Sequence, residues 1–577
     1  MALTPLVYMP DALQPADLPR WLWLQLLVTA SSFVLARSFS SGVRFPWGLS
    51  ASLALLCLGL LSVLWAGDKG AALLQLLQWV TGFQLLILGT LMARNYRRAT
   101  LYGLVFAGGL AAAIGVLQAL DMAPPVFAQV FSPASSFINR NQAAEFVAAL
   151  CPLALLLTCL ETRVWLRLLY APLTGLCWLF VVLGRSRSSW LALLITSLFL
   201  VGLIVKHPTV REVFNGWRQH LSGVLLLICL TVFIGFPAGN GSGSATRNAL
   251  GDELSTIASG QIVADENVNT VAVRLALYRN SLGMLADFPM GVGLGNFSRH
   301  YGAYHKYAVP TPTYALTVEP DRLHNDPYQI LVELGLPGLV LFGLLLLNVA
   351  GVLRRDVGIP PRDFLLERVG PLLVVLLVLV NGFASFPLHV PLTAGMFWLC
   401  CGLCLPPLVT VREKGSGALG GVLLVFNLLL AALYGAGLYA NVLRSGISSA
   451  MYRGELQKAL DLSTRAMHAF PLDWHATDEL LSIACSLPNP SNGELRLAVA
   501  LTERRPFSAN SWYRRARLHV ELRQFGPALD AVNRALKLLG EDVKLLQLRA
   551  RIYQNLGDED AARVDLMRAA LLLEALQ

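Results

Sequence analysis

Long apolar runs recur along this chain, and they constrain its fold more than any other feature. A helix needs about 20 apolar residues to cross the hydrocarbon core of a bilayer. The runs lie near residues 20–37, 47–66, 71–93, 100–120, 143–160, 164–184, 189–206, 221–237, 328–353, 369–387, 391–410 and 419–442. Because lipid offers the backbone no hydrogen-bond partners, each run must be helical. The sequence therefore predicts an all-α, polytopic membrane protein with about twelve transmembrane helices.

The composition supports this prediction and argues against nucleic acid as a partner. The chain is 55% hydrophobic and only 14% charged, whereas a soluble domain carries roughly 25% charged residues. The net charge of +9 comes from Arg and Lys that lie mainly in short loops and in the tail, where membrane topology explains them. Cys401 and Cys404 have CxxC spacing but no second ligand pair, so we expect no metal site.

Basic loop residues predict the orientation, because Lys and Arg favour the cytoplasmic side of a membrane. They follow each odd-numbered run, as Arg37, Arg44, Arg94, Arg97, Arg98, Arg163, Arg167, Lys206, Arg211, Arg218, Arg354, Arg355, Arg362 and Arg368. The alternate loops and the tail are thereby assigned to the outside, which is periplasmic in a Gram-negative cell. The predicted parts are a first membrane half (1–237, about eight helices), a large periplasmic loop (238–327), a second membrane half (328–442, about four helices) and a tail (443–577).

Three arginines lie in outer loops that this charge rule would leave neutral. Arg140 stands in FINRNQ, and Arg185 and Arg187 stand in GRSRSS. Guanidinium groups beside Ser and Asn suit a phosphate or diphosphate, which they bind through paired hydrogen bonds. Snorkelling at helix ends is the alternative for any one of them alone. The candidate contacts are Arg140, Arg185, Arg187 and Arg274.

The outer interval ends in EPDRLHNDPYQ, which places His324 at the membrane entry of the ninth helix. Glu319, Asp321 and Arg322 precede it and could orient its ring. An imidazole titrates near neutral pH, which suits a general base. A satisfied surface or capping residue is the alternative interpretation of a histidine at an interface.

An amphipathic helix is predicted at about 268–286 within the same interval. It is followed by GVGLG, residues 291–295, in which alternate glycines permit a tight turn. The string matches no nucleotide-binding loop and follows no predicted strand. We therefore interpret this turn as structural rather than as a phosphate cradle.

A 34-residue period marks the tail. It relates Trp512 to Leu546, Ala516 to Ala550, Ala528 to Ala562 and Ala535 to Ala569, with Gly557 at a turn and Ala459, Ala466 and Pro471 in an earlier unit. This period is typical of tetratricopeptide repeats, in which small residues lie where paired helices cross. With 475–508 as a degenerate unit, the tail is predicted to be a solenoid of three to four helix pairs that binds a partner.

One spaced motif resembles a known family. His324-Asn325, nine intervening residues and Gly335-Leu336-Pro337-Gly338-Leu339 match the signature of the bacterial O-antigen ligase superfamily, which includes O-antigen polymerases and protein O-oligosaccharyltransferases. FINRNQAAEF, GRSRSSWLALL and the stretch from Arg274 through DFPMGVGLGNF resemble its recurring blocks. The resemblance covers roughly residues 45–400 and excludes the repeat tail.

The resemblance implies a GT-C-like, multi-pass protein of the bacterial inner membrane that transfers a glycan from an undecaprenyl-diphosphate carrier to an acceptor hydroxyl. It implies neither a metal nor another cofactor. On matching positions, His324 would be the base, and Arg140, Arg185, Arg187 and Arg274 would hold the diphosphate. Asn139, Asn141, Asn325, Asp326 and Asp321 would support them.

The acceptor stays open at this point, and so does one alternative class of protein. The acceptor is lipid A core or a growing polysaccharide in one hypothesis, and a protein such as a pilin in another, with the repeat tail engaging that partner. A transporter with a repeat scaffold would also contain many helices. It predicts ionisable residues in mid-membrane, whereas the polar candidates here cluster on one outer surface.

Overall fold

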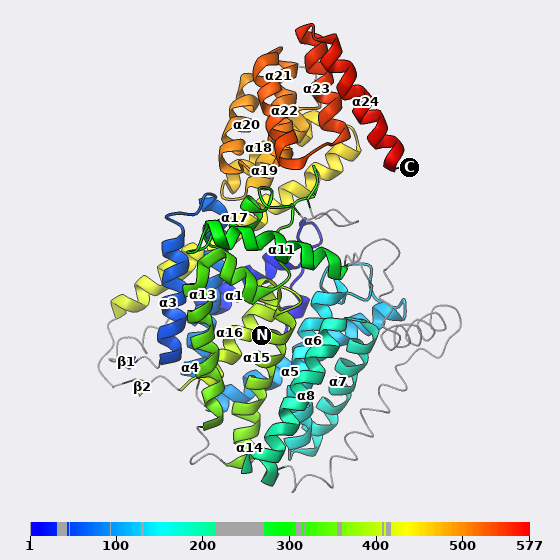
Figure 1. Ribbon diagram of the computed structural model, residues 1–577. Helices are drawn as coiled ribbons and strands as arrows, with labels where there is room; N and C mark the ends of the chain where they lie inside the picture. Colours follow the sequence, from blue (N-terminus) through cyan, green and yellow to red (C-terminus); the bar gives the residue numbers. More distant parts are fainter. Residues whose placement is uncertain are drawn as a thin grey trace.

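The computed structural model describes residues 2–31, 43–44, 47–92, 94–127, 132–208, 210–213, 270–306, 314–316, 318–354, 360–406, 409–410, 417–487 and 490–576. These residues are overwhelmingly helical. Their longest strands are β1 (Val43–Arg44) and β2 (Val409–Thr410), which pair antiparallel with Val43 opposite Thr410. The all-α prediction is thus confirmed for the described part of the chain. Figure 1 shows a broad helical bundle with a narrower stack of helices at one end.

The broad bundle contains the helices that correspond to the predicted apolar runs. They are α1 (Asp17–Ala30), α3 (Trp47–Ser62), α4 (Lys69–Leu91), α5 (Arg94–Ala119), α6 (Arg140–Leu160), α7 (Val164–Leu183), α8 (Arg187–Lys206), α13 (Asp326–Ala350), α15 (Gly370–Gly382), α16 (Pro391–Cys404) and the first part of α17 (Gly417–Tyr452). Shorter elements are η1 (Thr4–Leu6), η2 (Gly351–Arg354), α14 (Pro361–Phe364), η3 (Leu365–Val369) and η4 (Pro387–His389).

Seven helices in the described residues are long and apolar enough to cross a bilayer, and α3 and α16 are shorter apolar helices. The chain is therefore a membrane protein, while the number of twelve spans stays a prediction. The predicted run 221–237 lies outside the described residues. One boundary was wrong: α15 ends at Gly382, not near 387, and the residues after it form a loop with η4.

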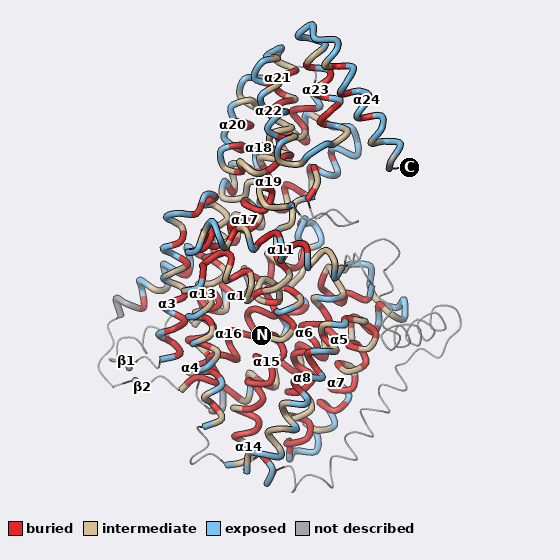
Figure 2. Tube along the Cα trace, in the orientation of Figure 1, coloured by how far each residue is buried: buried red, intermediate tan, exposed pale blue. Residues whose placement is uncertain are grey.

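Burial separates the centre of the bundle from its lipid-facing rim. Every residue of α16 is buried, and so are nearly all residues of α6 beyond its first turn. In α8, by contrast, Leu191, Leu194 and Leu198 are more than half exposed at helical spacing. An apolar helical face without a protein partner is what contact with lipid requires. Figure 2 shows the same division between the buried interior and the exposed outer helices.

The tail forms a stack in which each helix packs on the next. After α17 come α18 (Leu456–Ala469), α19 (Trp474–Ala484), α20 (Asn492–Arg504), α21 (Ala509–Glu521), α22 (Phe525–Leu539), α23 (Val543–Leu556) and α24 (Glu559–Leu576). The alanines of the 34-residue period are all buried in this stack. Gly557 ends α23 in the left-handed conformation, with φ 82°. The small residues thus allow close approach between successive helices.

The turn between α20 and α21 docks the tail onto the loops of the membrane bundle. Arg504 pairs with Asp68, the N-cap of α4, at 2.8 Å, and the buried Arg505 pairs with Glu319 at 2.6 Å. The Tyr314 hydroxyl donates to the Phe507 carbonyl at 2.7 Å and accepts from the Ala509 amide at 2.8 Å. The tail therefore lies at the same end of the bundle as the loop that leads into α13 (Figure 1).

Replacing Arg505 with Ala should loosen this docking. Its guanidinium also covers the Trp474 ring, 3.8 Å from the ring centroid, so the substitution removes packing as well as the partner of Glu319. Breaking a buried pair from one side typically costs about 3–5 kcal/mol. We expect faster hydrogen–deuterium exchange in 314–322, measured by mass spectrometry on the detergent-solubilised chain. Arg496→Ala, at an exposed position of α20, is the control, and equal exchange in both variants would contradict the docking role.

Candidate functional site

His324 lies in the loop directly before α13 and has a strained backbone. Its φ is +55°, a left-handed conformation that is uncommon for residues other than glycine. The Tyr278 hydroxyl donates to the His324 carbonyl at 3.0 Å. The imidazole packs edge-on against the Phe386 ring, with 5.0 Å between centroids. Strain of this kind persists only where neighbouring contacts impose it, and it is common at functional sites.

The next two residues attach the loop to the connection between α15 and α16. Asn325 is the N-cap of α13: its side-chain oxygen accepts from the Tyr328 amide at 2.9 Å, while its amide group donates to the Phe383 carbonyl at 3.2 Å. The Asp326 carboxylate accepts from the Leu388 amide at 2.9 Å and from Nδ1 of His389 at 3.0 Å. Asn325 and Asp326 therefore support the site from within the protein.

Helix α11 (Thr270–Asp287) brings Arg274 and Tyr278 to the same place. The Tyr328 hydroxyl donates to the Tyr278 carbonyl at 3.0 Å, which ties α11 to α13. Burial, and in second place the positive charge of Arg274, lower the pKa of His324 to about 4. An imidazole with this pKa is neutral near pH 7, which is the form that a general base requires.

Glu145 links helix α6 to this cluster. Its side chain is 1% exposed. The carboxylate is hydrogen-bonded to Ser385 and lies within electrostatic range of Asp326 and Arg274. Glu145, which the sequence analysis did not select, thus lies near Asp326 and Arg274, which it did select.

The remaining arginine candidates lie at the ends of α6, α7 and α8. Arg140 is the first residue of α6, and Arg185 occupies the turn after α7 with a φ of +48°. A methyl group added to Gly184 would lie 3.3 Å from Cβ of Ala144, so this turn packs against the first turns of α6. Arg140 and Arg185 therefore flank the end of α6 that carries Glu145. Arg187 is exposed and begins α8.

Other sequence candidates have structural partners instead. The Asn139 side chain caps α6 by accepting from the Asn141 amide at 2.8 Å. Glu319 binds Arg505 and Ser508 of the tail. Arg322 donates to Gln75 at 3.3 Å, and Asp321 is exposed. The contacts of Glu319 and Arg322 thus lead to other elements, while Tyr278 and Phe386 contact His324.

The GVGLG turn confirms its structural interpretation. Gly291, Gly293 and Gly295 all have positive φ. Backbone N–H groups of the turn donate hydrogen bonds to α13. The Gly293 amide donates to the Glu333 carbonyl at 2.9 Å, and the Gly295 amide donates to the Glu333 carboxylate at 2.8 Å. These N–H groups are therefore occupied and cannot cradle a phosphate.

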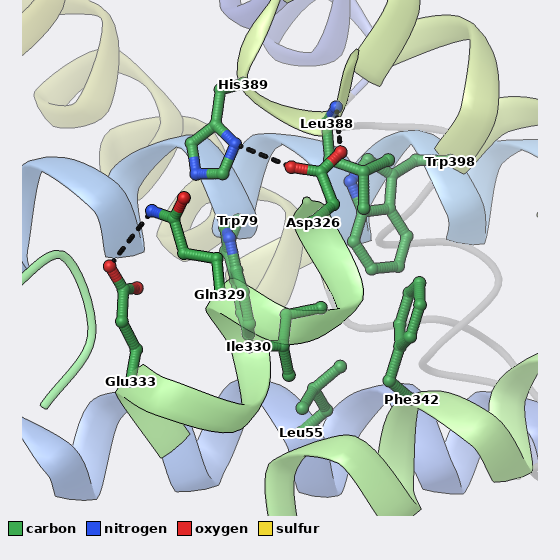
Figure 3. Close-up of a pocket in the computed structure, with 10 residues that line it drawn as sticks. All are labelled: Leu55, Trp79, Asp326, Gln329, Ile330, Glu333, Phe342, Leu388, His389 and Trp398. Atoms are coloured by element: carbon green, nitrogen blue, oxygen red, sulfur yellow. Dashed lines mark hydrogen bonds and ion pairs between the residues drawn. The ribbon is translucent and has the colours of Figure 1, made fainter. Parts of the chain in front are cut away.

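A small cavity lies beneath the start of α13, and Figure 3 shows its lining. Asp326, Gln329, Glu333 and His389 form its polar side, and aromatic and aliphatic side chains such as Trp398 form the rest. Its volume of about 20 Å³ matches a single water molecule. A sugar or a diphosphate does not fit there. The cavity therefore belongs to the packing around the start of α13.

Sequence reasoning missed the loop after α15, which supplies Ser385, Phe386 and His389 to the cluster. The stretch FASFP is apolar enough to extend the predicted helix over it. Pro387 was the available signal, because proline cannot continue a helix interior.

Among the described residues, no group of three or more His, Cys, Asp or Glu side chains is arranged to hold a metal ion.

These features define a polytopic membrane protein with a neutral histidine and several arginines at one end of its helices. Residues 172–343 match the family model described as O-antigen ligase, so this segment of the chain is similar to the O-antigen ligase family. The match suggests a glycan-transferring enzyme. The match spans His324 and Gly335 but not Arg140 or His389. No curated protein matches the chain.

Gly335 of the signature should be intolerant of a side chain. It breaks α13 with a φ of +67°, and an added Cβ would lie 2.5 Å from the Pro289 carbonyl oxygen. A left-handed conformation costs other residues roughly 1–2 kcal/mol, and the clash adds to this. Gly335→Ala should therefore lower the midpoint of thermal unfolding in detergent. Gly343→Ala is the matched control on α13, because nothing lies within 4 Å of its added Cβ; equal midpoints would refute the explanation.

Proposed function

We propose that this protein is a metal-independent glycosyltransferase that moves a glycan from an undecaprenyl-diphosphate carrier to an acceptor hydroxyl. The observation that carries the proposal is the half-buried His324, whose backbone is strained and whose pKa is lowered beside Arg274. It lies within the segment that matches O-antigen ligases.

His324 acts as the general base in this proposal. Its neutral imidazole accepts the proton of the acceptor hydroxyl while that oxygen forms a bond to the anomeric carbon of the donor sugar. The bond between this carbon and the phosphate oxygen breaks, and undecaprenyl diphosphate leaves with the electron pair. The diphosphate is already a good leaving group, so the protein needs to stabilise its growing charge and to position the acceptor.

Arg140, Arg185, Arg187 and Arg274 are the proposed diphosphate contacts. Arg274 acts electrostatically on both His324 and Glu145, which supports a place for it beside the reacting groups. The left-handed backbone of Arg185 supports a functional role in the way that the strain at His324 does. Asn141 stays a weaker candidate for a sugar or phosphate contact, and Asp321 a possible supporting residue.

We place the His324 end of the bundle, the large loop and the tail in the periplasm, with the protein in the inner membrane. The docking of Arg505 on Glu319 supports a common side for tail and loop. Arg98 supports the opposite side for the basic loops, since it pairs with Asp363 of α14 and Glu367 of η3, and α14 lies at the far end of the bundle in Figure 1.

The tail is best explained as a tetratricopeptide solenoid, because the alanines of its 34-residue period are buried between successive helices. Such repeats bind partners. The preferred acceptor is lipid A core or a growing polysaccharide. The second candidate is a protein acceptor such as a pilin, engaged by the tail. Its support is that the tail docks on the loop that leads to His324.

Replacing His324 with Ala should abolish glycan transfer, because no base would then receive the acceptor proton. The test compares lipopolysaccharide ladders, extracellular polymer length and pilin mass in one strain, and the product that disappears identifies the acceptor. His468→Ala, at an exposed position of the tail, is the control. If all three products persisted with normal insertion of the variant, the base assignment would fail and a transporter would become the better explanation.

The pH profile should report the low pKa of His324. A base with a pKa of about 4 is neutral above that pH, so transfer should persist at pH 5.5 to 6 (roughly one to two units above it) and decline only toward pH 4. Arg274→Gln removes a positive charge that lowers this pKa, so the acidic limb of the profile should move to higher pH. Arg279→Gln on α11 is the control. An acidic limb that stays fixed in Arg274→Gln would contradict the electrostatic link.

A further inference from the structure

We propose that His389 is a positioning residue for the transfer described above: the hydrogen bond from its Nδ1 to the Asp326 carboxylate holds the loop that carries His324. The inference rests on the proposed function of His324. His389 lies outside the matched segment, 65 positions after His324 in the chain.

The geometry shows a carboxylate with both oxygens engaged. Asp326 is 2% exposed. One oxygen accepts the Leu388 amide at 2.9 Å, and the other accepts Nδ1–H of His389 at 3.0 Å. Figure 3 shows His389 and Leu388 directed at the two oxygens of Asp326. Since both donors belong to η4, the carboxylate fastens the start of α13 to the connection between α15 and α16.

The same connection forms the surroundings of His324. Phe386 packs against its imidazole, and Ser385 is hydrogen-bonded to Glu145 of α6. The Phe383 carbonyl accepts from the side chain of Asn325. A shift of this loop would therefore move one wall of the histidine site and its link to α6 together.

The strain at His324 explains why such a fastening is needed. A residue other than glycine in the left-handed region relaxes unless its neighbours hold it. Tyr278 holds the His324 carbonyl, and Asn325 caps α13. Asp326 is the third residue that holds this loop in place, and it does so through its hydrogen bonds to Leu388 and His389. Loss of the His389 hydrogen bond leaves a buried carboxylate oxygen without this donor, which favours rearrangement of the loop.

The chemistry required of His389 is a single directed N–H group. We assign the proton of this contact to Nδ1, so that the carboxyl group of Asp326 accepts. Burial lowers the pKa of His389 well below its usual value, and the nearby Arg322 lowers it further, which keeps the ring neutral. An asparagine side chain can place an N–H at nearly the position of Nδ1, whereas leucine fills the space without a donor.

The test compares His389→Leu with His389→Asn in the full-length chain in proteoliposomes, with a lipid-linked glycan as donor. We expect His389→Leu to lower kcat by about 10- to 100-fold, because small misplacements of a reacting group have effects of this size. The KM for the donor should change little. His389→Asn should restore most of kcat, which a role in packing alone would not produce.

Hydrogen–deuterium exchange of 322–328 gives a readout that is independent of activity. Exchange should be faster in His389→Leu and near the parent rate in His389→Asn. Wild-type kcat and exchange in His389→Leu would overturn the inference, and so would an asparagine variant that behaves like the leucine variant. If His324→Ala kept full transfer, the proposed function would fail, whereas the exchange comparison would still decide the positioning role.

Discussion

The Asp326 carboxylate is the point on which the arrangement of the site depends. A carboxylate buried at the end of a membrane helix is costly unless donors satisfy it. The backbone of Leu388 and the ring of His389 supply those donors. This requirement forces the loop after α15 to lie against the start of α13. Phe386 and Ser385 of the same loop then reach His324 and Glu145, so one polar requirement brings α6, α13 and the α15–α16 connection together.

The docked tail applies a second constraint from the outer side. Glu319 lies five residues before His324 in the chain and is bound by Arg505 and Ser508. Asp68, which caps α4, is bound by Arg504. The loop into α13 is thus fixed to the tail at one point and to the bundle at another. A tail held in this way is part of the framework that positions the loop before α13.

Periodicity and motif spacing predicted the features that are local in sequence. The apolar runs predicted the membrane helices, and the 34-residue period predicted the close-packed alanines such as Ala516 and Ala550. The spaced motif that begins at His324-Asn325 pointed to His324. Arg274, predicted as a diphosphate contact, lies within electrostatic range of that histidine. His389 and Arg505 could not be found in this way, because their roles arise from contacts across 63 and 186 positions of the chain. Glu145 was hidden because it is a single carboxylate within an apolar run.

In the proposed function, the electrostatics of the site favour separate roles for His324, which accepts a proton, and for the arginines, which bind the diphosphate. Positive charge is needed to stabilise a departing diphosphate, yet the same charge would prevent a histidine from holding a proton in the ground state. Here burial and Arg274 act in one direction and keep His324 neutral. A bound diphosphate would offset the charge of the arginines and raise the affinity of the imidazole for a proton. Under the proposed function, His324 would therefore become a stronger base once the donor is bound.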